Sequence, residues 1–404
     1  IRREFDLSEG DAFNQILIRC AQKRLEALDF FERVQITTRQ GSAPDRVVVV
    51  VQVADKPTGE FGLGVGYTTG DGANNGLNFE ASIAQRNFQG RGQALKLAVG
   101  GSADQRTYDI SFTEPYFLGY RLSATFRGFR STTNFETEDY ESEVTGGSVS
   151  FGLPITDALT GILGYNYSQT EYTYGDDCLT AGGAPNLGAA ACNVPTAIAN
   201  EIGMAGASDT WTRSSVNYGF IYNTIDNRAN PRDGIYVNLN QELAGLGGDA
   251  RFVKTTGEAR YYQTLSEEAE LVGFVKVGAG NIVGLDQDIR VFDHLNIGPT
   301  RLRGFEANGI GPVDAAGNHL GGTTYFNATA EAQFAFPAVP RSLGFKGAVF
   351  ADAATLFGSD LAEATAASTD MSWRASAGVS LIWNSPFAPL RVDYAFPLVK
   401  EDTD

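Results

Sequence analysis

Residues 77–83 read Leu-Asn-Phe-Glu-Ala-Ser-Ile, a strict alternation of apolar and polar side chains. Successive side chains of a β-strand point to opposite faces, so this period of two predicts a strand with one apolar and one polar face. The polar face includes the carboxylate of Glu80. An apolar face beside a charged one is typical of a strand with lipid on one side and water on the other.

The same period of two recurs along most of the chain, for example in Tyr108–Phe112, Ile235–Leu239 and Leu390–Phe396. In a membrane, strands satisfy their backbone groups through their neighbours, which favours a barrel. The sequence therefore predicts an all-β transmembrane antiparallel β-barrel over residues 58–404. We expect fifteen strands, near residues 61–69, 76–86, 92–101, 105–114, 120–130, 141–151, 158–172, 210–224, 234–244, 251–264, 269–280, 322–336, 344–355, 372–384 and 388–397.

The connections between the predicted strands differ in length. Those after even-numbered strands are mostly short and rich in Pro and Gly, as in Gly152-Leu153-Pro154. The two long connections, residues 173–209 and 281–321, follow the seventh and eleventh strands and therefore fall on one side. Outer-membrane barrels have short periplasmic turns and long external loops, so we expect both long connections to be extracellular.

An odd number of strands is unusual for a bacterial barrel. We therefore expect a 16-stranded type whose last strand is missing from the residues given. A soluble β-sandwich or propeller is the alternative. A propeller is disfavoured because no blade-length repeat is present, and a sandwich because it would bury one face of each strand, where charged residues are frequent here. No apolar run approaches the ~18 residues of a membrane helix.

Residues 1–57 have a different pattern. Apolar residues between Phe13 and Leu28 follow helical spacing, and β-branched runs follow at Val34–Thr38 and Val47–Val53. This pattern predicts two helices followed by a β-hairpin, in a small α+β domain that is incomplete at its start. Lys56–Gly59 forms a short linker to the barrel.

Composition limits the possible functions. The chain has 404 residues and a formal net charge of −17, and its Lys and Arg form no basic stripe, so we expect no nucleic-acid partner. Cys178 and Cys192 lie in one long connection and can pair in an oxidising compartment, with two free thiols as the other interpretation. We interpret Cys20 as a small buried apolar residue.

No residue pattern indicates catalysis. His294 and His319 both lie in the connection 281–321 without partners at metal-ligand spacing, so we interpret them as solvated loop residues. Gly62, Gly64 and Gly66 lie within a strand instead of opening a helix, which argues against a phosphate-binding loop. With no nucleophile–base pair to name, we predict no enzyme activity, no metal and no cofactor.

The segment Thr300-Arg301-Leu302-Arg303-Gly304-Phe305 lies deep in the connection 281–321. It resembles the Val/Ile-Arg-Gly-Phe/Tyr motif of the outer-membrane assembly and secretion family whose members carry POTRA domains. Further segments resemble that family in its own order: residues 24–34 its last POTRA domain, 58–67 the entry into the barrel, and 113–117, 298–305 and 384–390 later landmarks. The resemblance spans essentially the whole chain, and the ordered set is more specific than any one motif.

The chain also departs from the family pattern. The last strand with its terminal aromatic signal, part of the first POTRA strand and any earlier POTRA domains are absent from the sequence given. The resemblance therefore implies a POTRA-like periplasmic domain at residues 1–57, incomplete at its start, before the barrel at 58–404.

An arginine that reaches into a barrel is costly unless a carboxylate pairs with it. Alternation in the strands places Glu331 and Asp352 on the inner face. The resemblance implies the same pairing, so we predict a lumen lock, formed by Leu302, Arg303, Gly304, Phe305, Glu331 and Asp352. A solvated loop arginine is the alternative.

The first predicted barrel strand alternates glycines with large apolar residues, in the order Phe61, Gly62, Leu63, Gly64, Val65, Gly66 and Tyr67. Glycine weakens the interior of a strand. Together with the resemblance, this predicts a lateral seam at which the first strand pairs weakly with the last and a client strand can pair instead. Relief of crowding inside the barrel is the plainer interpretation of the glycines.

The resemblance implies an outer-membrane protein assembly factor that folds and inserts client β-barrel proteins without nucleotide. Its expected partners are unfolded outer-membrane β-barrel clients, outer-membrane lipid and lipopolysaccharide, and accessory lipoproteins that dock on POTRA domains. The expected location is the outer membrane of a Gram-negative-type bacterium, with the N-terminal domain in the periplasm. A POTRA-containing polypeptide secretion pore, a related translocation and assembly factor, and a passive porin are the alternatives.

Overall fold

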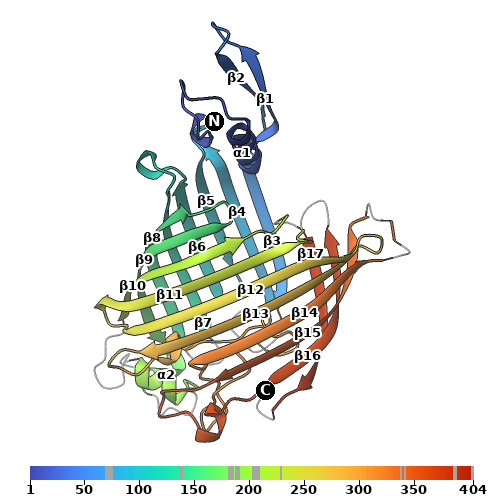
Figure 1. Cartoon of the computed structure of the whole chain (residues 1–404). Coiled ribbons are helices and arrows are strands. Elements are labelled where there is room, and N and C mark those ends of the chain that lie inside the picture. Colours follow the sequence, from blue (N-terminus) through green and yellow to red (C-terminus); the bar gives the residue numbers. More distant parts are fainter. Residues whose placement is uncertain are drawn as a thin grey trace.

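The computed structural model describes residues 1–404 except 69–75, 136–139, 181–185, 187–191, 203–209, 228–229, 307, 337–338, 341–342, 385–388 and 402–404 (Figure 1). One large curled sheet carries a small N-terminal segment at one end. No helix in the described part of the chain is both long enough and apolar enough to cross a membrane.

The large sheet contains fifteen antiparallel strands, and each pairs with its neighbours in the sequence. The fifteen predicted strands are all confirmed, although several extend a few residues further than predicted. The strands are β3 (Gly59–Thr68), β4 (Gly76–Phe88), β5 (Gln93–Gly101), β6 (Gln105–Glu114), β7 (Ser123–Phe135), β8 (Tyr140–Pro154), β9 (Leu159–Tyr174), β10 (Thr210–Asn223), β11 (Gly234–Gly248), β12 (Phe252–Ser266), β13 (Leu271–Gly284), β14 (Thr324–Ala335), β15 (Phe345–Phe357), β16 (Arg374–Asn384) and β17 (Pro389–Val399).

The sheet curls into an open barrel (Figure 1). Within the described residues, β3 pairs only with β4 and β17 pairs only with β16, so these two strands are the edges of the sheet. The N-terminal segment lies at the end where β3 begins, and the short helix α2 (Thr196–Glu201) lies at the opposite end. The two long connections, which contain α2 and the 3₁₀ turn η4 (Val291–Asp293), therefore lie together, away from the N-terminus.

The two faces of the sheet differ as the alternation predicts. Large apolar side chains such as Phe61, Leu239 and Val392 are exposed on the outer face. Glu331 and Asp352 point inward and are only 6% and 3% exposed. They are buried because the long connection between β13 and β14 folds back against the inner wall, so the core of the molecule lies inside the barrel.

This core joins the connection to the strands around it. Its buried side chains, each at most 5% exposed, are Ala244, Ala250, Phe252, Ile282, Ile289, Leu295, Ile297, Leu302, Ile310, Tyr325, Ala354 and Leu356. Burying apolar side chains in this way stabilises the folded-back position of the connection. The barrel is thus filled on its inner side by its own chain.

The N-terminal segment contains one α-helix, α1 (Gln15–Ala27), and the hairpin of β1 (Phe31–Gln40) and β2 (Val47–Asp55). The hairpin agrees with the prediction, but the prediction of two helices is wrong. The side chain of Asn14 accepts hydrogen bonds from the backbone N–H groups of Ile16 and Leu17, so the helix begins there. The apolar residues from Ile16 onward therefore belong to one continuous helix.

Polar contacts hold the N-terminal segment against the short turns at the same end of the barrel. The Tyr116 hydroxyl donates to Glu4 Oε1 at 2.6 Å, and burial together with the Glu4 carboxylate raises the pKa of Tyr116 to about 12. The Arg3 guanidinium lies 4.5 Å from the centre of the Tyr116 ring and donates to the Arg91 carbonyl at 2.6 Å. These contacts set the position of the segment relative to β3.

Close packing between strands gives a first testable prediction. A Cβ added at Gly219 in β10 would lie 2.2 Å from the Leu239 carbonyl oxygen, whereas a Cβ at Gly128 in β7 would meet nothing nearer than Ile110 Cγ2 at 3.5 Å. Gly219→Ala should lower the free energy of unfolding by roughly 1–3 kcal/mol, because backbone must move. Gly128→Ala, the matched control, should change it by less than about 0.5 kcal/mol. Urea midpoints of protein refolded into detergent micelles would measure both, and equal midpoints would contradict the packing.

Candidate functional site

The segment around Arg303 is held inside the barrel by its own backbone and by apolar packing. The N–H groups of Arg301 and Leu302 donate to the Gly298 carbonyl at 2.9 and 3.2 Å, which forms a tight turn. Leu302 is only 1% exposed and anchors the turn in the core. Gly304 has φ +88°, a conformation that favours glycine, and a Cβ there would lie 3.0 Å from the Ala395 Cβ of β17.

Arg303 contacts both predicted carboxylates. Its Nε and Nη2 donate to Asp352 Oδ2 and Oδ1 at 2.7 and 2.8 Å, and its Nη1 donates to Glu331 Oε2 at 2.9 Å. The backbone N–H of Arg303 also donates to Asp352. The guanidinium lies 3.3 Å from the centre of the Phe350 ring. A bidentate pair with a planar guanidinium fixes orientation as well as charge, so the geometry holds the loop in one position.

A second arginine joins the site from the edge strand β17. Arg391 donates to Glu331 Oε1 and Oε2 at 3.0 and 2.7 Å, and to Ser380 Oγ at 2.9 Å. Its Nε donates to Asp393 at 2.9 Å, and Asp393 lies 3.6 Å from Arg303 Nη1. Glu331 is thus shared by two arginines, one from the loop and one from β17.

Sequence reasoning missed Arg391 and Asp393 as members of the site. Alternation had already placed both on the polar face of the last predicted strand. No sequence signal indicated their partner, because Glu331 is 60 residues away along the chain. The structure therefore extends the lumen lock from the loop and two barrel strands to one edge of the sheet.

The seam residues occupy a different place. Phe61, Leu63 and Val65 are 64–72% exposed on the outer face of the edge strand β3. Gly62 and Gly64 pair with Ser82 and Glu80 of β4, on the inner face. For Gly66 and Tyr67 the structure describes the backbone, which also pairs with β4. The lumen lock contacts the other edge strand, β17, so the two predicted residue sets lie on opposite edges of the open sheet.

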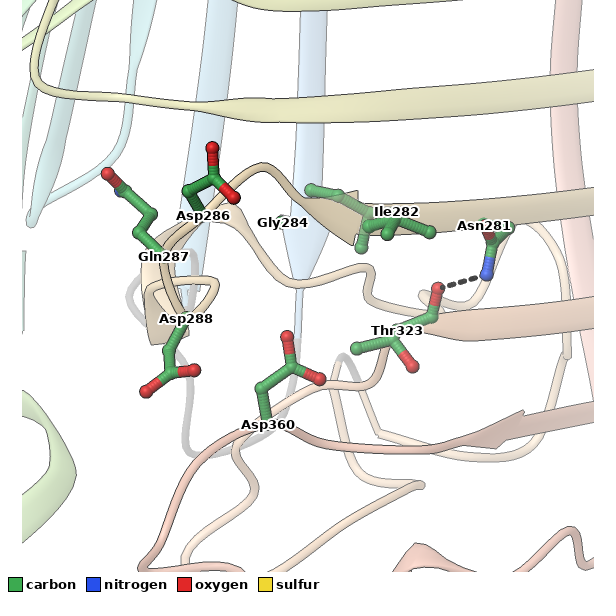
Figure 2. A pocket seen from close by; sticks show the side chains of 9 residues that line it. Asn281, Ile282, Gly284, Asp286, Gln287, Asp288, Thr323 and Asp360 are labelled. Carbon is green, nitrogen blue, oxygen red and sulfur yellow. Dashed lines mark hydrogen bonds between the residues drawn. The ribbon is translucent and has the colours of Figure 1, made fainter.

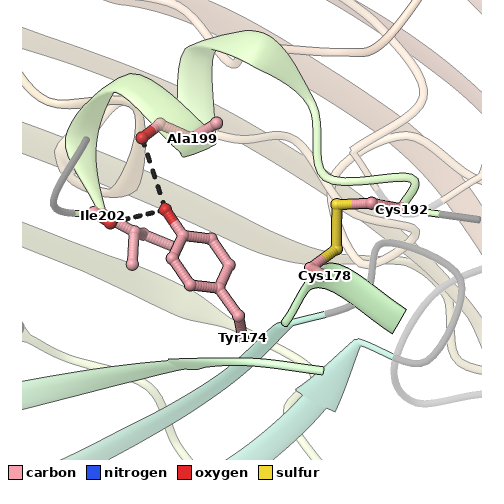
Figure 3. Close-up of a disulfide and its surroundings, with 5 residues drawn as sticks. All are labelled: Tyr174, Cys178, Cys192, Ala199 and Ile202. Atoms are coloured by element: carbon pink, nitrogen blue, oxygen red, sulfur yellow. Dashed lines mark hydrogen bonds between the residues drawn. A yellow bond between two sulfur atoms is a disulfide. The ribbon is translucent and has the colours of Figure 1, made fainter. Parts of the chain in front are cut away.

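The long connection between β9 and β10 contains a disulfide between Cys178 and Cys192, shown in Figure 3. Close to it, the Tyr174 hydroxyl donates to the Ile202 carbonyl at the end of α2. Glu201 of α2 accepts from Arg290 of the other long connection at 3.0 Å. The two long connections therefore support each other. Cys20 is a free, half-buried cysteine in α1.

Both histidines lie in the connection between β13 and β14, but the interpretation of solvated residues is wrong for His294. His294 is only 4% exposed because the connection folds into the barrel, and neither ring nitrogen has a hydrogen-bond partner among the described residues. Among those residues no cluster of three His, Cys, Asp or Glu could hold a metal ion. Figure 2 shows an open pocket beyond the end of β13 in which Asp286, Asp288 and Asp360 point in different directions.

Comparison with known proteins agrees with this architecture. The model of the Omp85 superfamily domain matches residues 87–404. The outer membrane protein assembly factor BamA of Neorickettsia risticii is 28% identical over 407 residues, which cover 100% of this chain and 51% of that protein. The chain therefore spans about half the length of this curated relative.

Two solved structures show the same fold. The crystal structure of BamA from Haemophilus ducreyi lacking POTRA domains 1–3 has a TM-score of 0.75 at 24% identity, and the match covers 100% of this chain and 79% of that one. CdiB from Acinetobacter baumannii has a TM-score of 0.65 at 12% identity, with 99% and 68% covered. At these identities the likeness concerns the barrel fold alone.

The lumen lock gives a second prediction. Arg303→Ala leaves Asp352 buried without its ion-pair partner, whereas Glu331 keeps Arg391. Removing one partner of a buried ion pair costs about 3–5 kcal/mol, so the loop should leave the lumen and become sensitive to proteinase K. In a double variant with Arg303→Ala, Asp352→Asn should restore part of the resistance to proteinase K, and Glu331→Gln should restore less.

Arg301→Ala is the matched control for this prediction. Arg301 lies two residues away, and its guanidinium donates to the Asn296 carbonyl and lies over the face of Tyr325. Its removal should leave the loop protected. Equal protease sensitivity in wild type, Arg303→Ala and Arg301→Ala would show that the ion pairs do not hold the loop.

The buried histidine gives a third prediction. Burial, with Lys254 nearby, lowers the pKa of His294 to about 4 from an ordinary value near 6.5. The neutral ring therefore contributes stability at pH above about 6.5, and this contribution is lost as pH falls towards 4, up to about 3 kcal/mol. His294→Leu should flatten the fall of the thermal unfolding midpoint between pH 7 and pH 4. His319→Leu, the control, should leave it steep, and identical slopes would contradict the argument.

Proposed function

This chain belongs to the Omp85 superfamily, and on that premise we propose that it is the membrane part of an outer-membrane protein assembly factor. It would fold and insert client β-barrel proteins into the outer membrane of a Gram-negative-type bacterium, without nucleotide. Support comes from the relatives with that name and from the fold they share. The relatives are named as assembly factors, which agrees with a role that needs no catalytic residue.

The proposal assigns a location to each part of the chain. Residues 1–57 would form a POTRA-like domain in the periplasm, on which accessory lipoproteins dock. Residues 58–404 would form the barrel, with outer-membrane lipid and lipopolysaccharide around it and the long connections outside. The N-terminal segment and the long connections lie at opposite ends of the sheet, which supports this arrangement.

The observation that carries the proposal is the composition of β3. Its outer face exposes Phe61, Leu63 and Val65, while Gly62 and Gly64 on its inner face offer no side chain to pack, and among the described residues its backbone pairs with β4 alone. Unpaired N–H and C=O groups are costly in lipid, so an edge strand at this position attracts another strand. In the proposed 16-stranded barrel a further strand closes the gap between β17 and β3, and weak pairing there forms the lateral seam.

The seam supplies a driving force that needs no nucleotide. Each ladder hydrogen bond contributes roughly 0.5–1.5 kcal/mol net in water, and an unsatisfied group costs more in lipid. A client strand that pairs with β3 satisfies those groups and then buries its own apolar face in the membrane. The glycines at 62 and 64 lower the strength of the original pairing, because glycine offers no side chain to pack.

A passive porin fits the structure less well. The connection between β13 and β14 fills the inner side of the barrel with buried apolar residues and the lumen lock. A steady open pore would leave this space to water. A polypeptide secretion pore shares the fold, but the curated relatives that cover the whole chain are named as assembly factors.

The fourth prediction tests the seam in the complete protein, reconstituted in liposomes with an unfolded client barrel. A disulfide between a cysteine at Gly64 and one in the closing strand should abolish client insertion, and reduction should restore it. Insertion at the normal rate by the locked protein would disprove lateral opening.

The control for the seam disulfide crosses two strands that already pair. Val216 of β10 lies directly opposite Tyr165 of β9, on the outer face. A Tyr165→Cys and Val216→Cys pair should form the same kind of bond and leave insertion unchanged. If this control also stops insertion, general stiffening of the barrel explains the effect instead of the seam.

A further inference from the structure

A charged contact crosses the inner wall of the barrel from the edge strand β17 to β14, past the two strands that lie between them. Arg391 of β17 donates from Nη1 and Nη2 to Glu331 Oε1 and Oε2 of β14, at 3.0 and 2.7 Å. Arg127 of β7, by contrast, pairs with Asp109 of the neighbouring strand β6. A pair between neighbours adds to a ladder that already joins them, whereas the contact of Arg391 joins strands that share no ladder.

The reach of this contact depends on the curvature of the wall. Neighbouring strands lie about 4.8 Å apart, so three spacings separate β17 from β14 by roughly 14 Å along the sheet. Side chains on the inner face of a curled sheet converge, which brings those of Arg391 and Glu331 together (Figure 1). On a flatter wall the same two side chains would point in parallel and stay apart. The ion pair therefore requires a particular curvature of the wall.

Arg391 is held in this direction from its own side of the wall. Its Nε donates to Asp393 Oδ1 at 2.9 Å, and its Nη2 donates to Ser380 Oγ of β16 at 2.9 Å. The Ser380 hydroxyl in turn donates to Asp393, which lies directly opposite it on β17. The guanidinium is a planar fork with fixed donor directions, so these two partners orient the donors that face β14.

The carboxylate at the other end of the contact is buried. The Glu331 side chain is 2% exposed, and it also accepts from Arg303 Nη1 and Gln333 Nε2, both at 2.9 Å. Arg303 must also neutralise Asp352, whose side chain is 1% exposed. Without Arg391, one arginine would face two buried carboxylates, and a buried charge without its partner is costly. Glu331 therefore holds Arg391 tightly.

An edge strand has fewer contacts to fix its position than an interior strand. β14 pairs with β13 and β15, whereas among the described residues β17 pairs with β16 alone. The angle between neighbouring strands varies widely, so a single ladder lets an edge strand swing relative to the rest of the sheet. A contact that reaches past both neighbours to β14 removes this freedom.

We propose that the Arg391–Glu331 pair is a cross-brace that fixes the curvature of the wall from β14 to β17 and thereby the position of the seam. Arg391 is a positioning residue in this role, because it acts through β17. Arg303 holds the loop and Arg391 holds the edge strand, although both bind Glu331. The proposal rests on the proposed function in one respect: the strand that follows β17 closes the barrel against β3, so the position of β17 sets the gap that a client strand enters.

The experiment measures a distance across the braced wall in the complete protein, reconstituted in liposomes. Spin labels are attached on the outer face at Leu239→Cys of β11 and Val392→Cys of β17, and Cys20→Ser removes the free thiol. Double electron–electron resonance should give one narrow distance distribution in the labelled protein with Arg391 present. Arg391→Met should broaden the distribution and shift its mean by about 5 Å, one strand spacing. An unchanged distribution would overturn the brace.

Further variants separate the brace from other effects. Arg391→Lys keeps a cation that can reach Glu331, and it should return the distribution most of the way to that of the parent. Arg127→Met, the matched control, removes an inner-face arginine that pairs with a neighbouring strand, and it should change nothing. The same shift in Arg127→Met would show that any inner-face arginine has this effect and would overturn the assignment.

The loop and the edge strand should respond to different arginines. Arg303→Ala should leave the distance unchanged, because Glu331 keeps Arg391. Arg391→Met should leave the loop resistant to proteinase K, because Asp352 keeps Arg303. Equal effects of the two substitutions on both measurements would contradict separate roles.

A double variant keeps the test valid if Arg391→Met does not fold. Adding Glu331→Gln removes the uncompensated buried charge together with the brace. The double variant should therefore fold and show the broad, shifted distribution. A narrow distribution with the parent's mean in the double variant would overturn the brace.

Client insertion is followed in the same liposomes. Arg391→Met should slow insertion about tenfold, which corresponds to about 1.4 kcal/mol in the barrier, and Arg127→Met should not slow it. A broad distribution with normal insertion would refute the role of the brace at the seam and leave the proposed function standing. A parent protein that inserts no client would refute the proposed function, while the distance measurement would still decide whether the brace exists.

Discussion

The folded-back connection depends on one arginine inside the barrel. Arg303 lies between Glu331 and Asp352, which are almost fully buried, and either carboxylate would be costly in that position without a cation. The apolar core inside the barrel depends on the connection staying there, because five of its twelve buried residues belong to the connection: Ile289, Leu295, Ile297, Leu302 and Ile310. The ion pairs therefore fix the position of the loop in the barrel, and the apolar contacts supply most of the free energy that favours this position.

The same interaction makes the two edges of the sheet unequal. On the inner face of β17, Arg391 and Asp393 join the charged network and Ala395 packs against Gly304. On the inner face of β3, Gly62 and Gly64 have no side chain to contribute. One edge is thus tied to the loop and the lumen, and the other is held by a single ladder of backbone hydrogen bonds. In the function that we propose, a client strand that pairs with β3 would not need to disturb the lock.

Much of this structure follows from the sequence, for identifiable reasons. All fifteen strands could be predicted, because a strand with one lipid-facing and one water-facing side alternates apolar and polar residues. A short stretch of sequence is enough to show this period of two. The pairing of Arg303 could be predicted because alternation placed the acids inside and a family motif placed the arginine. Arg391 could not be assigned, since its partner is distant in the sequence. The burial of His294 could not be predicted, because nothing local shows that a long loop folds inward. Apolar spacing alone also does not show that the residues after the Asn14 cap form one continuous helix.

The structural role of a glycine in this barrel depends on the atoms that lie next to its Cα. At Gly219 and Gly378 on the inner side, a neighbouring backbone carbonyl occupies the space that a Cβ would need, so glycine allows strands to approach. At Gly128 on the outer side, a Cβ would meet only ordinary van der Waals contact, with Ile110 Cγ2 at 3.5 Å, so this glycine is not required by protein packing. Space that the protein leaves empty on a lipid-facing wall must be filled by lipid, because a void forfeits dispersion contacts on both sides. The role of each glycine therefore depends on its own neighbours: Gly219 and Gly378 let strands approach closely, whereas Gly128 leaves open space on the outer wall.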